Sequence, residues 1–182
     1  MAKALHILAD GFEDVEAVTA LDILRRAAVE VTVAGLDGNM VTGARGTRVT
    51  PDTTLETVRG GVFDALVLPG GTRGAENLAA SPLVREWVLA FHKAGKIIAA
   101  ICAAPAIVLA PLGVLDGRSA TCFPGMEDRF QTTTLFKTDP VVVDGALITS
   151  RALGTALAFS LALAEKLTDR STAERVRRAV LG

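Results

Sequence analysis

The chain has 182 residues, of which 50% are hydrophobic and 21% are charged, and its formal net charge is −1. This composition predicts one folded domain over residues 1–182, and the near-neutral charge provides no overall field that would attract a nucleic-acid partner. No apolar run approaches the roughly 20 residues that span a bilayer, and the N-terminus lacks the pattern of a signal peptide, so no membrane partner is expected.

Short apolar runs alternate with amphipathic stretches along the chain. Residues 4–8 predict a buried strand, and residues 13–27 predict a helix with acids at its start and arginines at its end, as the helix dipole favours. Residues 29–34 predict the next strand. Residues 35–51 carry Asp37-Gly38 and alternating apolar positions, which predicts a β-hairpin.

The same alternation continues in the second half of the chain. Residues 63–68 predict a strand that ends at Pro69-Gly70-Gly71, and residues 82–94 predict a helix with proline in its first turn. Residues 96–101 predict an apolar strand that leads directly to Cys102. The remaining predicted elements are a helix over 103–109, paired strands over 141–144 and 146–150, and helices over 155–167 and 172–181.

Strands that are apolar on both faces and separated by helices predict an α/β fold with a mostly parallel sheet and helices on both faces. Ligands of such folds bind beyond the carboxyl ends of the strands. Three predicted loops, over residues 10–16, 69–74 and 102–105, should therefore meet at one end of the sheet.

Cys102 is the residue in these loops with the most distinctive chemistry. A nucleophile on a tight strand-to-helix turn projects from the top of the sheet, and the free N–H groups of the following helix favour the thiolate. We therefore expect a pKa of the Cys102 thiol below the usual value of about 8.5. The alternative is that Cys102 is a small apolar core residue, and the local sequence alone leaves both interpretations open.

The neighbouring loops favour the nucleophile interpretation. Gly70 and Gly71 would let backbone N–H groups approach an oxyanion closely, although Pro-Gly-Gly is also an ordinary tight turn. Glu16 lies one turn into the first helix, where a buried carboxyl would have a raised pKa and could carry a proton. Glu13 and Asp14 are interpreted as acids that serve the helix dipole.

The sequence offers no motif for a cofactor or metal. His6 is predicted to be a satisfied core residue and His92 to lie at the opposite edge of the sheet, so no Cys–His pair is expected. No cysteine and histidine spacing fits zinc, and no glycine-rich nucleotide motif follows a strand. Two cysteines do not make a disulfide scaffold, so we expect Cys102 and Cys122 to be free thiols in the cytoplasm.

Four segments of the chain are distinctive in their residues, order and spacing. They are residues 7–16 (ILADGFEDVE), 67–71 (VLPGG), 99–105 (AAICAAP) and 149–151 (TSR). Together they resemble the ThiJ/PfpI superfamily, in the branch of the Parkinson-disease protein deglycase (DJ-one) and bacterial ThiJ-like proteins. The resemblance covers nearly the whole chain. It implies a flavodoxin-like fold, similar to that of class I glutamine amidotransferases, and a homodimer whose seam includes the first helix and the hairpin.

The resemblance also implies roles for particular residues. Cys102 would be the nucleophile, and a protonated Glu16 would hydrogen-bond to its sulfur. Backbone N–H groups of Gly71 and Ala103 would form the oxyanion site, and Arg45 would lie near the dimer seam. Phe123 stands where human-type members carry histidine, which departs from their pattern.

Two functions follow from the resemblance and share one site. The first is a cofactor-free glyoxalase or protein deglycase that acts on methylglyoxal, glyoxal or their early adducts. The second is a redox sensor and redox-regulated chaperone that works through oxidation of Cys102. A peptidase is not expected, because Ala103 stands where peptidase-like relatives place histidine.

Overall fold

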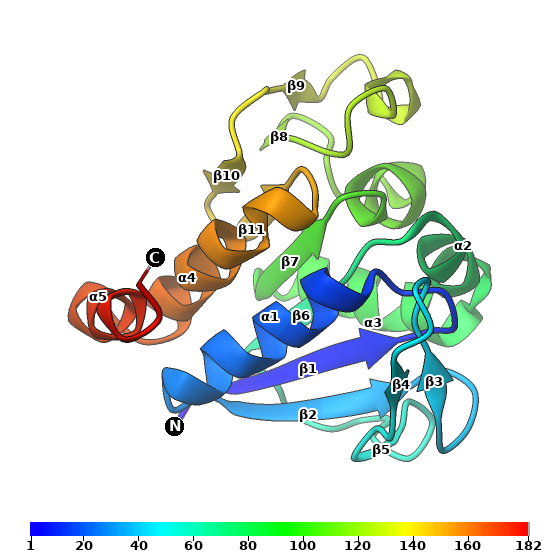
Figure 1. The fold of residues 1–182 in the computed structure, drawn as a ribbon. Helices are drawn as coiled ribbons and strands as arrows, with labels where there is room; N and C mark the ends of the chain where they lie inside the picture. Colours follow the sequence, from blue (N-terminus) through cyan, green and yellow to red (C-terminus); the bar gives the residue numbers. More distant parts are fainter. Residues whose placement is uncertain (182) are drawn as a thin grey trace.

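The computed structural model describes residues 1–181 and contains a seven-stranded sheet at its centre (Figure 1). The strand order is β10-β11-β7-β6-β1-β2-β5, and every neighbouring pair is parallel except β10 with β11. The strands are β1 (Lys3–Leu8), β2 (Glu30–Gly35), β5 (Thr53–Thr54), β6 (Ala65–Leu68), β7 (Ile97–Ile101), β10 (Val141–Asp144) and β11 (Leu147–Ser150). The predicted mostly parallel, flavodoxin-like sheet is confirmed.

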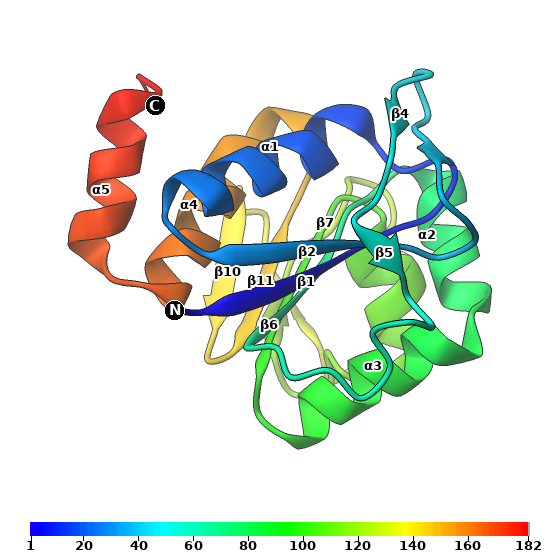
Figure 2. The same cartoon turned by 90° about the horizontal axis from the view of Figure 1, so that it is seen from below.

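Helices cover both faces of this sheet, as the sequence predicted. Figure 2 shows α1 and α4 on one side of the sheet and α3 on the other, with α5 outside α4. The helices are α1 (Asp14–Arg26), α2 (Thr72–Ala80), α3 (Pro82–Lys93), α4 (Ala156–Leu167) and α5 (Arg170–Ala179). Each face has its own apolar core, because alternate residues of a buried strand point to opposite sides. None of these helices is long and apolar enough to cross a membrane, within the described residues.

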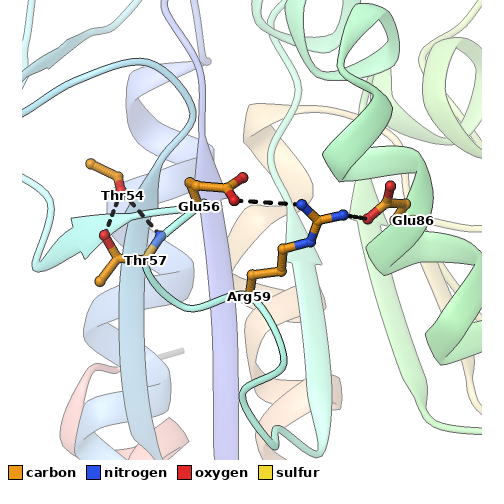
Figure 3. A network of polar contacts seen from close by, with 5 residues as sticks. All are labelled: Thr54, Glu56, Thr57, Arg59 and Glu86. Atoms are coloured by element: carbon orange, nitrogen blue, oxygen red, sulfur yellow. Dashed lines mark hydrogen bonds and ion pairs between the residues drawn. The ribbon is translucent and has the colours of Figure 1, made fainter.

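The expected hairpin forms from β3 (Val41–Thr42) and β4 (Arg48–Val49), which pair in antiparallel fashion. The sequence did not predict β5 or a second small pair, β8 (Ser119–Ala120) with β9 (Leu135–Phe136). After β5, Arg59 forms ion pairs with Glu56 and with Glu86 of α3, which links this connection to the helix (Figure 3).

Two helical segments differ from expectation. Helix α2 was not predicted, because its nine residues include Gly74 in the first turn. A Cβ at Gly74 would lie 2.7 Å from the backbone nitrogen of Phe12, so the glycine lets α2 pack against the loop after β1. The helix expected over 103–109 is a π-helix (Pro105–Leu109) in which Ala110 N–H donates to the Pro105 carbonyl. Pro111, which has no N–H, follows and prevents a regular α-helical continuation.

Candidate active site

Cys102 follows β7 in a strained backbone conformation. Its φ of +65° lies in the left-handed region, which costs a residue other than glycine about 1–3 kcal/mol. Cys102 N–H donates to the Ser150 carbonyl at 2.9 Å, and Phe123 N–H donates to the Cys102 carbonyl at 2.8 Å. The surrounding chain therefore fixes the turn, and the predicted position of Cys102 at a strand-to-helix junction is confirmed.

Glu16 lies near the start of α1 and is only 1% exposed. Its Oε2 accepts a hydrogen bond from the backbone N–H of Gly70 at 2.9 Å. Its Oε1 is buried and has no hydrogen-bond partner with good geometry among residues 1–181. One carboxyl oxygen is thus held in place, and the other is available to take up or release a proton.

Gly70 lies between the carboxyl and the thiol. A Cβ at this position would be 2.5 Å from the Cβ of Cys102 and 2.6 Å from Oε2 of Glu16. The absence of a side chain therefore lets both groups approach the end of β6, where the Cys102 thiol interacts with the Glu16 carboxyl.

The backbone N–H groups of Gly71 and Ala103 favour the thiolate form of Cys102, because they act to lower the pKa of its sulfur. Gly71 has a φ of +83° and directly precedes α2, so its conformation suits glycine. When a thiolate adds to a carbonyl group, the oxyanion forms on the carbon that is bonded to the sulfur. N–H donors beside the sulfur therefore also lie close to the position of that oxyanion.

Burial opposes ionisation of both the carboxyl and the thiol. Burial raises the pKa of Glu16 to about 7, against weaker opposing hydrogen bonds from Cys102 and Gly70. Burial and then the charge of Glu16 raise the pKa of Cys102 to about 12, and the N–H groups of Gly71 and Ala103 oppose this only in part. The predicted lowering of the thiol pKa is therefore wrong, because burial, the largest cause of the raised pKa, acts whether or not Glu16 is ionised. Protonation of Glu16 removes the charge that disfavours the thiolate, so the two groups titrate as a pair.

These groups open into a cavity of about 550 Å³. Glu16, Gly71, Cys102, Ala103 and Arg45 all line it, so the structure brings together the site residues expected from the sequence, with Gly70 directly behind them. Sequence reasoning did not assign a site role to several further lining residues. These are Asp10, Thr42, Thr72 and Arg73 among the polar ones, and Met126 and Leu153 among the apolar ones.

Asp14 has a different role from the one expected. Its carboxylate accepts hydrogen bonds from the backbone N–H groups of Arg45 and Thr47, each at 2.9 Å. Burial opposes its ionisation, but hydrogen bonds from the Thr47 side chain and from the backbone of Arg45 and Thr47 outweigh burial and hold the pKa of Asp14 below its usual value. Asp14 therefore bonds to the hairpin that carries Arg45, in addition to any interaction with the helix dipole.

The two histidines lie outside the cavity. His92 is in the last turn of α3 and lines a separate cavity of about 40 Å³, as expected for the far end of the sheet. His6 is 1% exposed in β1, but neither ring nitrogen has a hydrogen-bond partner among residues 1–181, so its prediction as a satisfied residue is wrong. Within the same residues, no group of three or more His, Cys, Asp or Glu side chains is placed to hold a metal ion.

The sequence pattern of the DJ-1/PfpI family matches residues 2–166. The chain belongs to this family. Protein dj-1beta of Drosophila melanogaster is 43% identical over 181 residues, which cover 98% of this chain and 96% of that protein. Its crystal structure matches with a TM-score of 0.95 and 42% identity, covering 99% of this chain and 97% of that one.

Two further DJ-1/PfpI relatives are informative about chemistry. The Caenorhabditis elegans glutathione-independent glyoxalase DJR-1.2 is 35% identical over 156 residues, which cover 85% of this chain and 82% of that protein. The structure of oxidized Toxoplasma gondii DJ-1 has a TM-score of 0.96 and 34% identity, covering 100% of this chain and 98% of that one. The family thus includes a member named as a glyoxalase.

Proposed function

We propose that this protein is a cofactor-independent glyoxalase that converts methylglyoxal or glyoxal to the corresponding hydroxy acid, and that it removes the same carbonyls from early amine adducts. The observation that carries the proposal is the buried Glu16 carboxyl beside the Cys102 thiol, with one of its oxygens free of other partners. The DJ-1/PfpI relative named as a glyoxalase supports the same chemistry.

The first step would form a hemithioacetal. The sulfur of Cys102 adds to the aldehyde carbon, the carbonyl π electrons move to oxygen, and the thiol proton ends on that oxygen after passing through Glu16. The N–H groups of Gly71 and Ala103 would stabilise the oxygen while it carries negative charge.

The second step would move hydrogen between the two carbons. The Glu16 carboxylate removes the proton from the former aldehyde carbon to give an enediolate, whose charge lies on the oxygen of the neighbouring carbon. The proton returns to that neighbouring carbon, and the hydroxyl proton of the first carbon moves to the charged oxygen, so that the first carbon becomes a thioester carbonyl. Water then cleaves the thioester and restores the thiol. The overall change is addition of one water to methylglyoxal to give lactic acid, with no external oxidant or reductant.

The test is lactate production from methylglyoxal by the wild type and three variants. Cys102→Ala should reduce conversion to the uncatalysed rate, whereas the control Cys122→Ala, which alters the other free thiol, should retain it. Glu16→Gln keeps a side chain that can hydrogen-bond to Gly70 but cannot transfer a proton, so turnover should fall by about 10²–10⁴-fold.

The rate of alkylation by iodoacetamide is a second measurement on Glu16→Gln, and it should change in the opposite direction from turnover. Removal of the Glu16 charge lowers the pKa of Cys102, so the variant should alkylate faster than the wild type at pH 8 while its turnover falls. Near wild-type lactate production by Cys102→Ala or by Glu16→Gln would contradict the proposed mechanism.

The second candidate function is redox sensing through Cys102, with chaperone action that depends on it. The observation that favours it is the same pair of N–H donors at the sulfur, because they would also stabilise the oxygens of a sulfenate or sulfinate. A peroxide-treated protein whose Cys102 gains two oxygens, together with a wild type that forms no lactate, would favour this function. For either function, the reducing cytoplasm is the compartment we propose, since it would keep both thiols free.

A further inference from the structure

The β3–β4 hairpin forms part of the wall of the active-site cavity but has little stability of its own. Thr42, Gly43, Ala44 and Arg45 line the cavity. Each strand of the hairpin has two residues, and only two residue pairs face each other across it. A two-stranded hairpin of this kind is marginal in water, so its position depends on bonds to the rest of the protein.

The strongest of these bonds lead to Asp14. Its carboxylate is 7% exposed, and its two oxygens accept the N–H groups of Arg45 and Thr47 at the tip of the hairpin, one oxygen for each. A Cβ at Gly43 would lie 2.6 Å from the Cγ of Asp14, so the hairpin backbone closes directly over the carboxylate. Hydrogen bonds to an ionised acceptor are about twice as strong as neutral ones.

The residues just before Asp14 also form hydrogen bonds to the same hairpin. The Asp10 carboxylate accepts the N–H of Thr42 at 2.8 Å, and Gly11 N–H donates to the Thr42 carbonyl at 2.8 Å. Ala44 N–H donates to the Phe12 carbonyl at 2.8 Å. Figure 2 shows the hairpin standing beside the N-terminal end of α1, where these residues lie.

We propose that Asp14 is a positioning residue that holds the β3–β4 hairpin as a wall of the active-site cavity and thereby sets the affinity for substrate. The proposal rests on the glyoxalase function for its kinetic consequence. Asp14 touches no reacting atom in this scheme. It acts through Arg45 and Thr47, and it lies two residues from Glu16. One short segment therefore contains the proton carrier and also bonds to part of the wall of the same cavity.

The test compares two variants that disturb the anchor in different ways. Asp14→Asn removes the charge and replaces one acceptor oxygen with an NH₂ group that faces a backbone N–H. Gly43→Ala retains Asp14 but places a methyl group where the carboxylate lies. The control is Asp22→Asn, which removes a carboxylate of the same helix that pairs with Arg26 at the surface.

We expect KM for methylglyoxal to rise about tenfold in Asp14→Asn and Gly43→Ala, with kcat within about twofold, because a smaller fraction of the protein has the wall in place. Amide hydrogen exchange at Arg45 and Thr47 should become about tenfold faster in both variants. Asp22→Asn should match the wild type in KM, kcat and exchange.

Two results would overturn the proposal. Unchanged exchange at Arg45 and Thr47 in Asp14→Asn would show that Asp14 does not hold the hairpin. Faster exchange with unchanged KM would show that the hairpin does not set substrate affinity. If the wild type itself converts no methylglyoxal, the glyoxalase function fails, and the exchange measurement still decides whether Asp14 anchors the hairpin.

Discussion

Two buried side chains should make the stability of this protein respond to pH in opposite directions. Burial and then the charge of Arg25 lower the pKa of His6 from 6.5 to about 4. Burial raises the pKa of Glu16 from 4.5 to about 7. Each of these two pKa differences between the folded and the unfolded chain corresponds to about 3–4 kcal/mol, since one pKa unit corresponds to about 1.4 kcal/mol.

The direction of each effect on stability depends on whether the folded or the unfolded chain binds the proton more tightly. Between pH 6.5 and about 4 the unfolded chain protonates His6 and the folded chain does not, so acidification destabilises the fold through this residue. Between about pH 7 and 4.5 the folded chain protonates Glu16 and the unfolded chain does not, so acidification stabilises the fold through that residue. The two contributions should nearly cancel in the wild type over the shared range.

Urea unfolding at pH 7 and at pH 4.5 separates the contributions. When the pH falls from 7 to 4.5, the free energy of unfolding of His6→Leu should rise by about 2–3 kcal/mol relative to that of the wild type. The reason is that the variant lacks the imidazole whose protonation favours the unfolded chain. That of Glu16→Gln should fall relative to the wild type by a similar amount. The packing cost of each substitution is common to both pH values and cancels. Stability profiles parallel to that of the wild type would refute the reasoning for the residue concerned.

Further outcomes are expected from other features of the site. Gly70→Ala should remove turnover and lower the free energy of unfolding by about 1–3 kcal/mol, because the added methyl group would overlap the Cys102 Cβ and the Glu16 carboxyl. An active variant of wild-type stability would contradict this contact. Phe123→Ala should raise KM for phenylglyoxal about tenfold and leave KM for glyoxal nearly unchanged. Phe123 lines the cavity and is 41% exposed, so its ring can pack on an aromatic group of the substrate. Equal changes in KM for both substrates would exclude such packing. Iodoacetamide should label Cys102 before Cys122, which is fully buried, and mass spectrometry that found equal labelling would argue against an accessible nucleophile. The family resemblance implies a homodimer, for which sedimentation should give twice the chain mass of 18.9 kDa, and the exposed Val15 is a candidate seam residue. A single-chain mass at micromolar concentration would exclude the homodimer.

The sheet could be predicted from the sequence because its strands have a simple physical signature. Runs such as residues 65–68 and 97–101 are apolar on both faces, and only a strand covered on both sides buries such a run in so few residues. Helix α2 had no comparable signal, because Gly74 lowers helix propensity and is explained only by the closeness of Phe12. The π-helix after Cys102 likewise depends on how two prolines divide a buried segment.

The identity of the site residues could be predicted from the sequence, whereas the pKa of the thiol and the contacts of Asp14 could not. Loops after parallel strands meet at one sheet edge, so Cys102 and Glu16 could be brought together from their positions alone. The pKa of Cys102 could not, because it depends on burial and on the closeness of Glu16, which opposes the N–H donors. The role of Asp14 depends on a hairpin more than 30 residues away in sequence, and only the folded chain places the two in contact.

At position 102, the residue type that the left-handed backbone conformation favours differs from the residue type that the proposed chemistry requires. Glycine is the residue that suits a φ of +65°, so the local backbone would be more relaxed without the nucleophile. The chain carries this strain permanently, and the sulfur has its orientation before any substrate arrives. Engineering for thermostability that optimised each position by backbone preference alone would therefore select against the residue on which reactivity depends.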